Sequence, residues 1–160
     1  GCDVSLYGCA KASSCHGKGI FRILAKARKE VWHMLPFTAV HHVAVIASSL
    51  EKARAFYVDA LGFKVLRENF RPAQGDCKLD LQLGDMELEI FIKPDAPKRP
   101  SYPEALGLRH LAFRVADAEA AVRALEERGI ACEPLRMDEI TGKRMTFFQD
   151  PDGLPLEIHE

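Results

Sequence analysis

Two histidines and two glutamates recur along this chain at one spacing. His42 precedes Glu89 by 47 residues, and His110 precedes Glu157 by the same 47 (89 − 42 and 157 − 110). Imidazole nitrogen suits zinc, nickel or iron, and carboxylate oxygen suits harder ions such as manganese. A repeat that preserved only a fold would not need to preserve these residue types. The spacing therefore predicts one divalent metal site made of all four side chains.

The residues around each histidine alternate in the way that is typical of a strand. The segments 41–49 and 109–117 place apolar side chains on one face and the histidine on the other. In each segment the alanine two residues after the histidine, Ala44 or Ala112, shares the histidine's face. A small neighbour leaves room above the imidazole for a metal and a substrate. His41 is expected on the opposite face from His42, without a ligand role.

The remainder of each copy predicts the same element order. Ser49 and Asp117 are typical helix N-caps, and Gly62 and Gly129 are expected to end the two helices in a left-handed conformation. Further strands are expected at residues 63–68 and 86–92 of the first copy and at residues 130–135, 145–149 and 154–158 of the second. The glutamates lie in the last strand of each copy. Each copy therefore reads strand–helix–strand–strand–strand.

This arrangement resembles the vicinal oxygen chelate superfamily, which includes glyoxalases, bleomycin resistance proteins and extradiol dioxygenases. The segment from Asp150 to Glu157 is most similar to small bacterial glyoxalase I-like proteins. The resemblance implies an α+β fold in which two tandem βαβββ modules form a curved mixed sheet. It covers residues 38–160, with modules at about 38–93 and 106–160 and a linker at 94–105. Residues 1–37 then form an N-terminal extension outside the core fold.

The resemblance also implies a reaction. One divalent ion (zinc, nickel, cobalt, manganese or iron, with zinc or nickel favoured) would be held by His42, Glu89, His110 and Glu157. Glu157 would be both ligand and catalytic base. The substrate would chelate through two neighbouring oxygens, as in the isomerisation of a 2-oxoaldehyde hemithioacetal by lactoylglutathione lyase. A fourth ligand at position 89 favours the glyoxalase or epimerase branch over fosfomycin thiol-transferases and dioxygenases.

The residues expected around the substrate depart from those of glyoxalase I. Ile46 and Lys93 stand where that enzyme has an arginine and an asparagine that bind glutathione, so the thiol stays open. Arg114, Lys143 and Arg144 are candidate substrate-binding cations, and Arg71, Lys78 and Arg99 lie in stretches that could rim a pocket. The alternatives are an Fe(II) extradiol-type dioxygenase, an epimerase, or a non-catalytic protein that binds a metal or small molecule.

Composition limits the partners. The 160 residues have a formal net charge of −1, which implies no general affinity for nucleic acid or acidic membranes. No apolar run reaches the ~20 residues that a membrane helix needs. The five cysteines are odd in number and form no Cys-x-x-Cys pair, as expected for reduced thiols in the cytoplasm. We expect a small-molecule substrate and allow for a homodimer.

The extension differs from the repeat in composition. Apolar residues at helical spacing occur between residues 20 and 35 beside several basic residues. This pattern fits either a targeting or partner-binding helix or an extension that docks loosely. Cys2, Cys9, Cys15 and His16 could in principle bind zinc, although their spacing matches no common zinc finger.

Overall fold

The structure, a computed structural model, describes residues 37–160 of the chain. The chain separates into two units, Gly1–Ala39 and Val40–Glu160. The expectations for a helix between residues 20 and 35 and for a zinc site near Cys2 lie outside the described residues. No helix among residues 37–160 is both long and apolar enough to cross a membrane.

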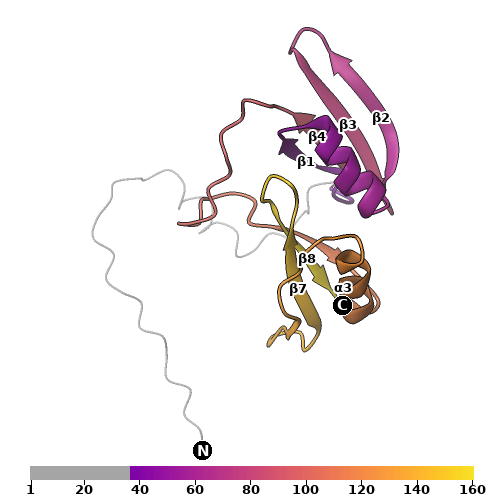
Figure 1. The fold of residues 1–160 in the computed structure, drawn as a ribbon, viewed down its shortest axis with the longest axis vertical. Helices are drawn as coiled ribbons and strands as arrows, with labels where there is room; N and C mark the ends of the chain where they lie inside the picture. The colour runs from indigo at the N-terminus through magenta and orange to yellow at the C-terminus, as the bar shows by residue number, and fades with distance from the viewer. Residues whose placement is uncertain (1–36) are drawn as a thin grey trace, which may run out of the picture. The chain divides into compact units, whose positions relative to one another are not determined.

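The first module contains a four-stranded sheet with the order β1-β4-β3-β2. Its elements are β1 (His42–Ala47), α2 (Leu50–Ala53), the π-helix η1 (Arg54–Ala60), β2 (Lys64–Arg71), β3 (Asp76–Leu83) and β4 (Met86–Ile92). β1 pairs with β4 in parallel, and the other pairs are antiparallel. The continuous helix formed by α2 and η1 lies across one face of this sheet (Figure 1).

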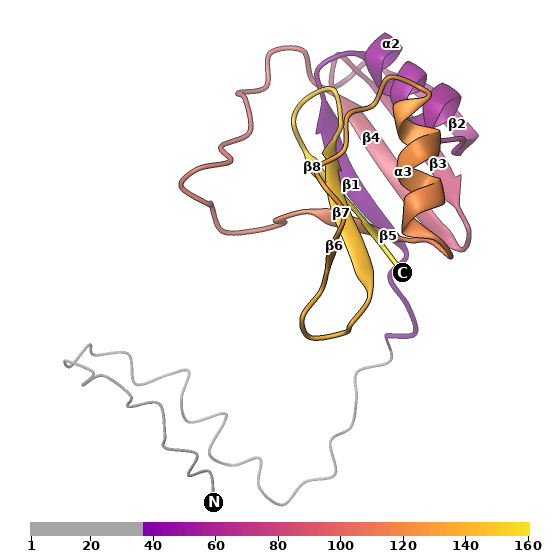
Figure 2. The same ribbon diagram turned by 60° about the horizontal axis from the view of Figure 1, so that its bottom comes forward.

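The second module repeats this topology as a sheet with the order β5-β8-β7-β6. Its elements are β5 (Leu111–Arg114), α3 (Ala118–Glu126), β6 (Arg136–Met137), β7 (Arg144–Gln149) and β8 (Pro155–His159). A long segment without helix or strand, residues 93–110, joins β4 to β5 (Figure 2). The predicted α+β fold of two βαβββ modules is therefore confirmed.

The helix boundaries follow the predicted capping residues. The Ser49 hydroxyl accepts a hydrogen bond from the Lys52 amide at 3.3 Å, and the Asp117 carboxylate accepts one from the Ala120 amide at 3.1 Å. These bonds satisfy amides that have no partner inside the helix. Gly62 and Gly129 follow the two helices with φ of 78° and 76°, a conformation that side chains with a Cβ disfavour.

The strand expected at residues 130–135 is wrong. The structure has only the two-residue strand β6 at this edge, and residues 130–135 are not in a strand. Pro134 has no amide to donate to a strand ladder, which limits pairing here. Two hydrogen bonds of Glu133 hold the segment to β7 instead. The Glu133 amide donates to the Phe147 carbonyl at 2.8 Å, and the Thr146 hydroxyl donates to the Glu133 carbonyl at 2.7 Å.

The core lies between the helices and the sheet faces that they cover. The alternation of each strand sends its apolar residues to that face, where Leu81, Leu88 and Leu156 are fully buried. The two modules share this core, because the Phe63 and Phe113 rings meet edge to face at 5.6 Å. His42, Glu89 and Glu157 alternate onto the opposite face of their sheets.

A buried hydrogen bond also links the modules. The Tyr57 hydroxyl on η1 donates to the Asp150 carboxylate at 2.8 Å. Burial, together with this carboxylate, raises the pKa of Tyr57 far above its usual range. Asp150 also accepts the amides of Asp152 at 2.9 Å and Leu154 at 2.8 Å, so one carboxylate orders the turn that precedes β8.

Candidate metal centre

The first His–Glu pair is formed by β1 and β4. Their parallel register sets Ala44 opposite Glu89, and His42 lies two residues before Ala44 on the same face. The His42 Nε2 and Glu89 Oε2 atoms are 3.7 Å apart. Because β1 and β4 are adjacent strands, a spacing of 47 residues in the sequence becomes a contact across one strand pair.

The second pair repeats this arrangement on β5 and β8. Ala112 lies opposite Glu157, and His110 directly precedes β5. The His110 Nε2 and Glu157 Oε2 atoms are 2.8 Å apart, and the Glu157 side chain is buried whereas the His110 ring is partly exposed. The small alanine predicted beside each histidine is therefore present at the same place in both modules.

The atoms of each pair can bind one metal ion. Two atoms that each lie about 2.0–2.2 Å from a common zinc are separated by no more than about 4.4 Å. Both observed separations, 3.7 Å and 2.8 Å, satisfy this limit. The donors are imidazole nitrogen and carboxylate oxygen, the set that borderline divalent ions take. The residues present therefore fit a divalent ion.

The four predicted ligands meet as two pairs within one chain, and not as a single set. Within residues 37–160, the ligand atoms of three metal-binding side chains lie within 4.8 Å of one another only at Asp80, Glu87 and Glu89. That group contains Glu89 but neither histidine. A complete four-ligand site is therefore a proposal that needs more than the contacts of one chain.

His41 departs from the expected alternation. It directly precedes β1, where its carbonyl accepts a hydrogen bond from the Glu87 amide at 3.3 Å, and its ring packs edge to face on the His42 ring at 5.2 Å. The two Nδ1 atoms are 2.9 Å apart. With the bridging proton on His42 Nδ1, the Nε2 atom of His42 that faces Glu89 keeps a free lone pair. His41 thus contacts the ring of a candidate ligand, which strand parity did not predict.

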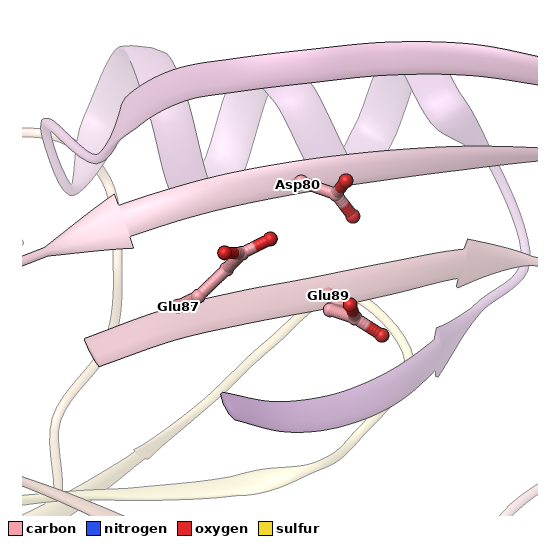
Figure 3. Close-up of side chains that lie close together, drawn as sticks. All are labelled: Asp80, Glu87 and Glu89. Carbon is pink, nitrogen blue, oxygen red and sulfur yellow. The ribbon is translucent and has the colours of Figure 1, made fainter. Parts of the chain in front are cut away.

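A network of charges surrounds the first pair. Figure 3 shows the carboxylates of Asp80 on β3 and of Glu87 and Glu89 on β4 close together. Two cations compensate them. Lys78 Nζ lies 2.6 Å from Glu89 and 3.1 Å from Asp80. Arg67 Nε donates to Asp80 at 2.8 Å, and the same guanidinium contacts Glu87.

The charges of this network stabilise one another. Burial alone would lower the pKa of Lys78, but its hydrogen bonds to Glu89 and Asp80 outweigh burial and raise that pKa. We therefore interpret the acidic group as an ion network and not as a second metal site. Sequence analysis missed Asp80, although a signal was present: it is a charged residue between Leu79 and Leu81, which point the opposite way.

The second pair has aromatic and apolar neighbours instead. Phe147 lies opposite Glu157 in the β7–β8 register, and its ring meets the His110 ring edge to face at 5.2 Å. Met145, two residues before Phe147 on β7, lies opposite His159. Among the side chains that the structure describes, His110 is the one ion-pair partner of Glu157.

The three cations predicted for substrate binding lie in different surroundings. Arg114 on β5 is exposed and lies opposite His159, and Lys143 is exposed in the loop before β7. Arg144 is ion-paired with Glu160 at 2.7 Å and with Glu119 at 3.4 Å, near the first turn of α3. These ion pairs engage Arg144 with carboxylates of its own module.

A cavity of about 830 Å³ lies beside the second pair. His110 and Phe147 line it together with Arg99, Arg109 and Arg136. Arg109 is paired with Glu104 at 2.6 Å, and Arg136 lies over the Phe147 ring at 5.2 Å. The candidate ligand His110 is therefore accessible from a cavity large enough for a small molecule.

Comparisons with known proteins agree with this fold. Residues 39–158 match the family model of the Glyoxalase/Bleomycin resistance protein/Dioxygenase superfamily. A crystal structure of a glyoxalase family protein from Enterococcus faecalis is 62% identical, with a TM-score of 0.75, and the match covers 78% of this chain and 98% of that one.

Two curated relatives extend the comparison. The uncharacterised protein YwkD of Bacillus subtilis is 54% identical over 123 residues, covering 76% of this chain and 96% of the relative. A 2-epi-5-epi-valiolone epimerase from an Actinomyces species is 30% identical over 142 residues, covering 75% of this chain and 78% of the relative. The chain belongs to the Glyoxalase/Bleomycin resistance protein/Dioxygenase superfamily.

Proposed function

We propose that this protein is a divalent-metal-dependent, glyoxalase I-like lyase or isomerase that transfers a proton next to a carbonyl group. The observation that carries the proposal is the pair of His–Glu contacts at matched positions of the two modules, at 3.7 Å and 2.8 Å. The substrate class is a molecule with two neighbouring oxygens, such as the thiol adduct of a 2-oxoaldehyde.

We further propose that a second copy of the chain completes the site. Each pair supplies two ligands, whereas catalytic zinc sites take three protein ligands and an open position. In a two-fold dimer, His42 and Glu89 of one copy would meet His110 and Glu157 of the other, and two identical sites would form. Ile46 supports this arrangement, because it is an apolar residue that is 59% exposed on the His42 face of β1.

The residues of the second pair are suited to moving the proton. A divalent ion bound there would act as a Lewis acid on the substrate oxygens. Among the described residues, His110 is the one basic side chain within 4.0 Å of the Glu157 carboxylate, so no lysine or arginine neutralises the base that takes a proton from the carbon next to the carbonyl. The Phe147 ring beside His110 shields one side of the pair from water.

An epimerase is the second candidate. The relative from Actinomyces is an epimerase by name, and it is 30% identical to this chain. Epimerisation and glyoxalase chemistry begin with the same proton abstraction and differ in the carbon to which the proton returns. Glu157 serves as the base in either reaction, whereas epimerisation also needs a second acid that returns a proton to the opposite face of the same carbon.

The test uses the full chain, stripped of metal and reloaded separately with Zn²⁺, Ni²⁺, Mn²⁺ and Co²⁺. It is assayed in deuterated water with methylglyoxal and several thiols. We expect at least one thiohemiacetal to be isomerised, with deuterium entering at the carbon next to the thioester carbonyl.

Other results would reject the proposal or change it. Exchange at one carbon of an acyl-CoA, with inversion, would select the epimerase. Oxygen consumption with a catechol and Fe²⁺ would select a dioxygenase, and metal binding without any turnover would select a binding protein. Failure to bind any of the metals would reject the site itself.

A further inference from the structure

We infer that Lys78 is a positioning residue that fixes Glu89 as a permanent metal ligand and thereby leaves Glu157 as the carboxylate that moves during the reaction. The inference rests on the proposed function and assigns unequal roles to two glutamates that the repeat makes equivalent. Three observations support it: how the Glu89 oxygens are shared, how Lys78 is held, and what replaces Lys78 in the second module.

The two oxygens of Glu89 have different partners. Oε2 is the oxygen near His42 Nε2, at 3.7 Å, and Oε1 accepts a hydrogen bond from Lys78 Nζ at 2.6 Å. A metal ion between His42 and Oε2 would therefore leave the lysine contact in place. Hydrogen bonds to the outer oxygen of a ligating carboxylate hold its orientation, and their loss typically costs ~10–100-fold in metal affinity or activity.

Lys78 is itself held in place. Its side chain is 19% exposed, and its ammonium also contacts Asp80 Oδ1 at 3.1 Å. Asp80 is 1% exposed, and its Oδ1 has no hydrogen-bond partner among the described residues, so the Lys78 ammonium is the group that compensates it. Moving the ammonium away would leave a buried carboxylate oxygen without compensation, which is unfavourable. Asp80 therefore keeps Lys78 against Glu89, while Arg67 holds the other oxygen of Asp80 at 2.8 Å.

The second module has no such support. Asp80 faces Glu89 across β3 and β4, and Phe147 faces Glu157 across β7 and β8. Two residues earlier along each strand, Lys78 corresponds to Met145. A thioether offers no charge and no donor, so no lysine contact holds the corresponding oxygen of Glu157. Two basic residues lie beside Met145, His159 opposite it and Arg136 at 3.3 Å from its sulfur, but among the described residues neither is ion-paired with Glu157. The same backbone therefore presents one fixed and one free carboxylate.

The experiment measures Zn²⁺ affinity by calorimetry and the visible spectrum of the Co²⁺-loaded protein, for the wild type, three test variants and one control variant. Lys78→Met removes the charge at similar length, Lys78→Arg keeps a cation, and Lys78→Met/Asp80→Asn also removes the buried charge left behind. Arg54→Met is the matched control, because it breaks the Arg54–Glu68 pair of the same module, at 2.7 Å, without contact to Glu89.

We expect Lys78→Met to bind Zn²⁺ about 10–100-fold more weakly and to change the Co²⁺ spectrum, with the oligomeric state unchanged. Lys78→Arg should recover most of the affinity, and Arg54→Met should retain all of it. The double variant should regain the thermal stability that is lost in Lys78→Met, but it should not regain the Zn²⁺ affinity. If the role of Lys78 were purely structural, the double variant would regain both.

Two results would overturn the inference. In one, wild-type protein binds Zn²⁺ and the Zn²⁺ affinity of Lys78→Met lies within about 2-fold of the wild-type value. Such a loss is smaller than that expected when a residue hydrogen-bonded to a metal ligand is removed. In the other, the double variant recovers stability and affinity together. If wild-type protein binds no metal, the proposed function itself fails, and the inference fails with it.

Discussion

The two His–Glu pairs share a backbone geometry and differ in their neighbours. In both, a histidine at or next to the start of one strand lies two residues before an alanine, and that alanine is opposite the glutamate on the adjacent parallel strand. Around Glu89, Lys78 and Asp80 form an ion network, whereas Phe147 faces Glu157. The comparison shows that the repeated fold sets the positions of the candidate ligands. The residues on the neighbouring strand, β3 or β7, set how firmly each glutamate is held.

Removing a histidine should have the largest effect on metal binding. His110→Ala and His42→Ala each delete half of a pair, and we expect Zn²⁺ affinity to fall by more than about 100-fold, beyond the loss typical of outer partners. His41→Ala should weaken binding by about 10-fold or less, because the His41 ring contacts Nδ1 of His42 and not the candidate ligand atom Nε2. Calorimetry with Zn²⁺ measures all three. Equal loss in the His41 and His42 variants would show that the wrong histidine has been assigned.

Neutralising the glutamates should separate their roles. Glu157→Gln removes the proposed base, so turnover at saturating metal should fall by about 100-fold or more while metal remains bound. Glu89→Gln should mainly weaken metal binding, and excess metal should restore much of its turnover. Steady-state kinetics across a metal titration distinguishes the two. The reverse pattern would make Glu89 the base.

Giving the second module a lysine should make the pairs more alike. Met145 corresponds in register to Lys78, so Met145→Lys places an ammonium near Glu157. We expect turnover to fall by about 10-fold while the metal remains bound. This loss is smaller than that expected for removal of the base, because the new ammonium would restrain Glu157 without removing it. The Arg136 guanidinium, whose Nε lies 3.3 Å from the Met145 sulfur, is exposed enough to move aside. Unchanged turnover would mean that freedom of Glu157 is not what distinguishes the pairs.

The link between the modules is unequal too, and breaking it should have the smallest effect. Tyr57 on η1 donates to Asp150, whereas the equivalent position 68 residues later (57 to 125) is the apolar Leu125. Tyr57→Phe leaves one buried oxygen of Asp150 without its donor, so the free energy of unfolding should fall by ~1–3 kcal/mol. Urea denaturation measures this. Tyr102→Phe, at a residue that is 87% exposed, is the control and should change nothing; equal effects would contradict the assignment.

Much of the fold was predictable, because its signals are local. Alternation in the strands, the caps at Ser49 and Asp117 and the positive φ at Gly62 and Gly129 depend on a few neighbouring residues. The strand prediction failed where a local sequence pattern had no neighbouring strand to pair with. Residues 130–135 contain strand-forming types, yet Pro134 and the short β6 edge leave them outside the sheet. His41 lies just before β1, so strand parity did not place its ring.

The ligand types and their doubled spacing are properties of the sequence, and they place each histidine beside its glutamate once parallel pairing is assumed. Which residues face those ligands depends on the register of β3 against β4 and of β7 against β8, and a shift of one residue would turn every side chain to the other face. The positions of Lys78 and Met145 relative to the two glutamates are therefore set only in the folded sheets. A charged neighbour restrains a carboxylate, whereas an apolar neighbour does not. The difference between Glu89 and Glu157 was therefore decided by the tertiary structure, which sets Lys78 beside one and Met145 near the other.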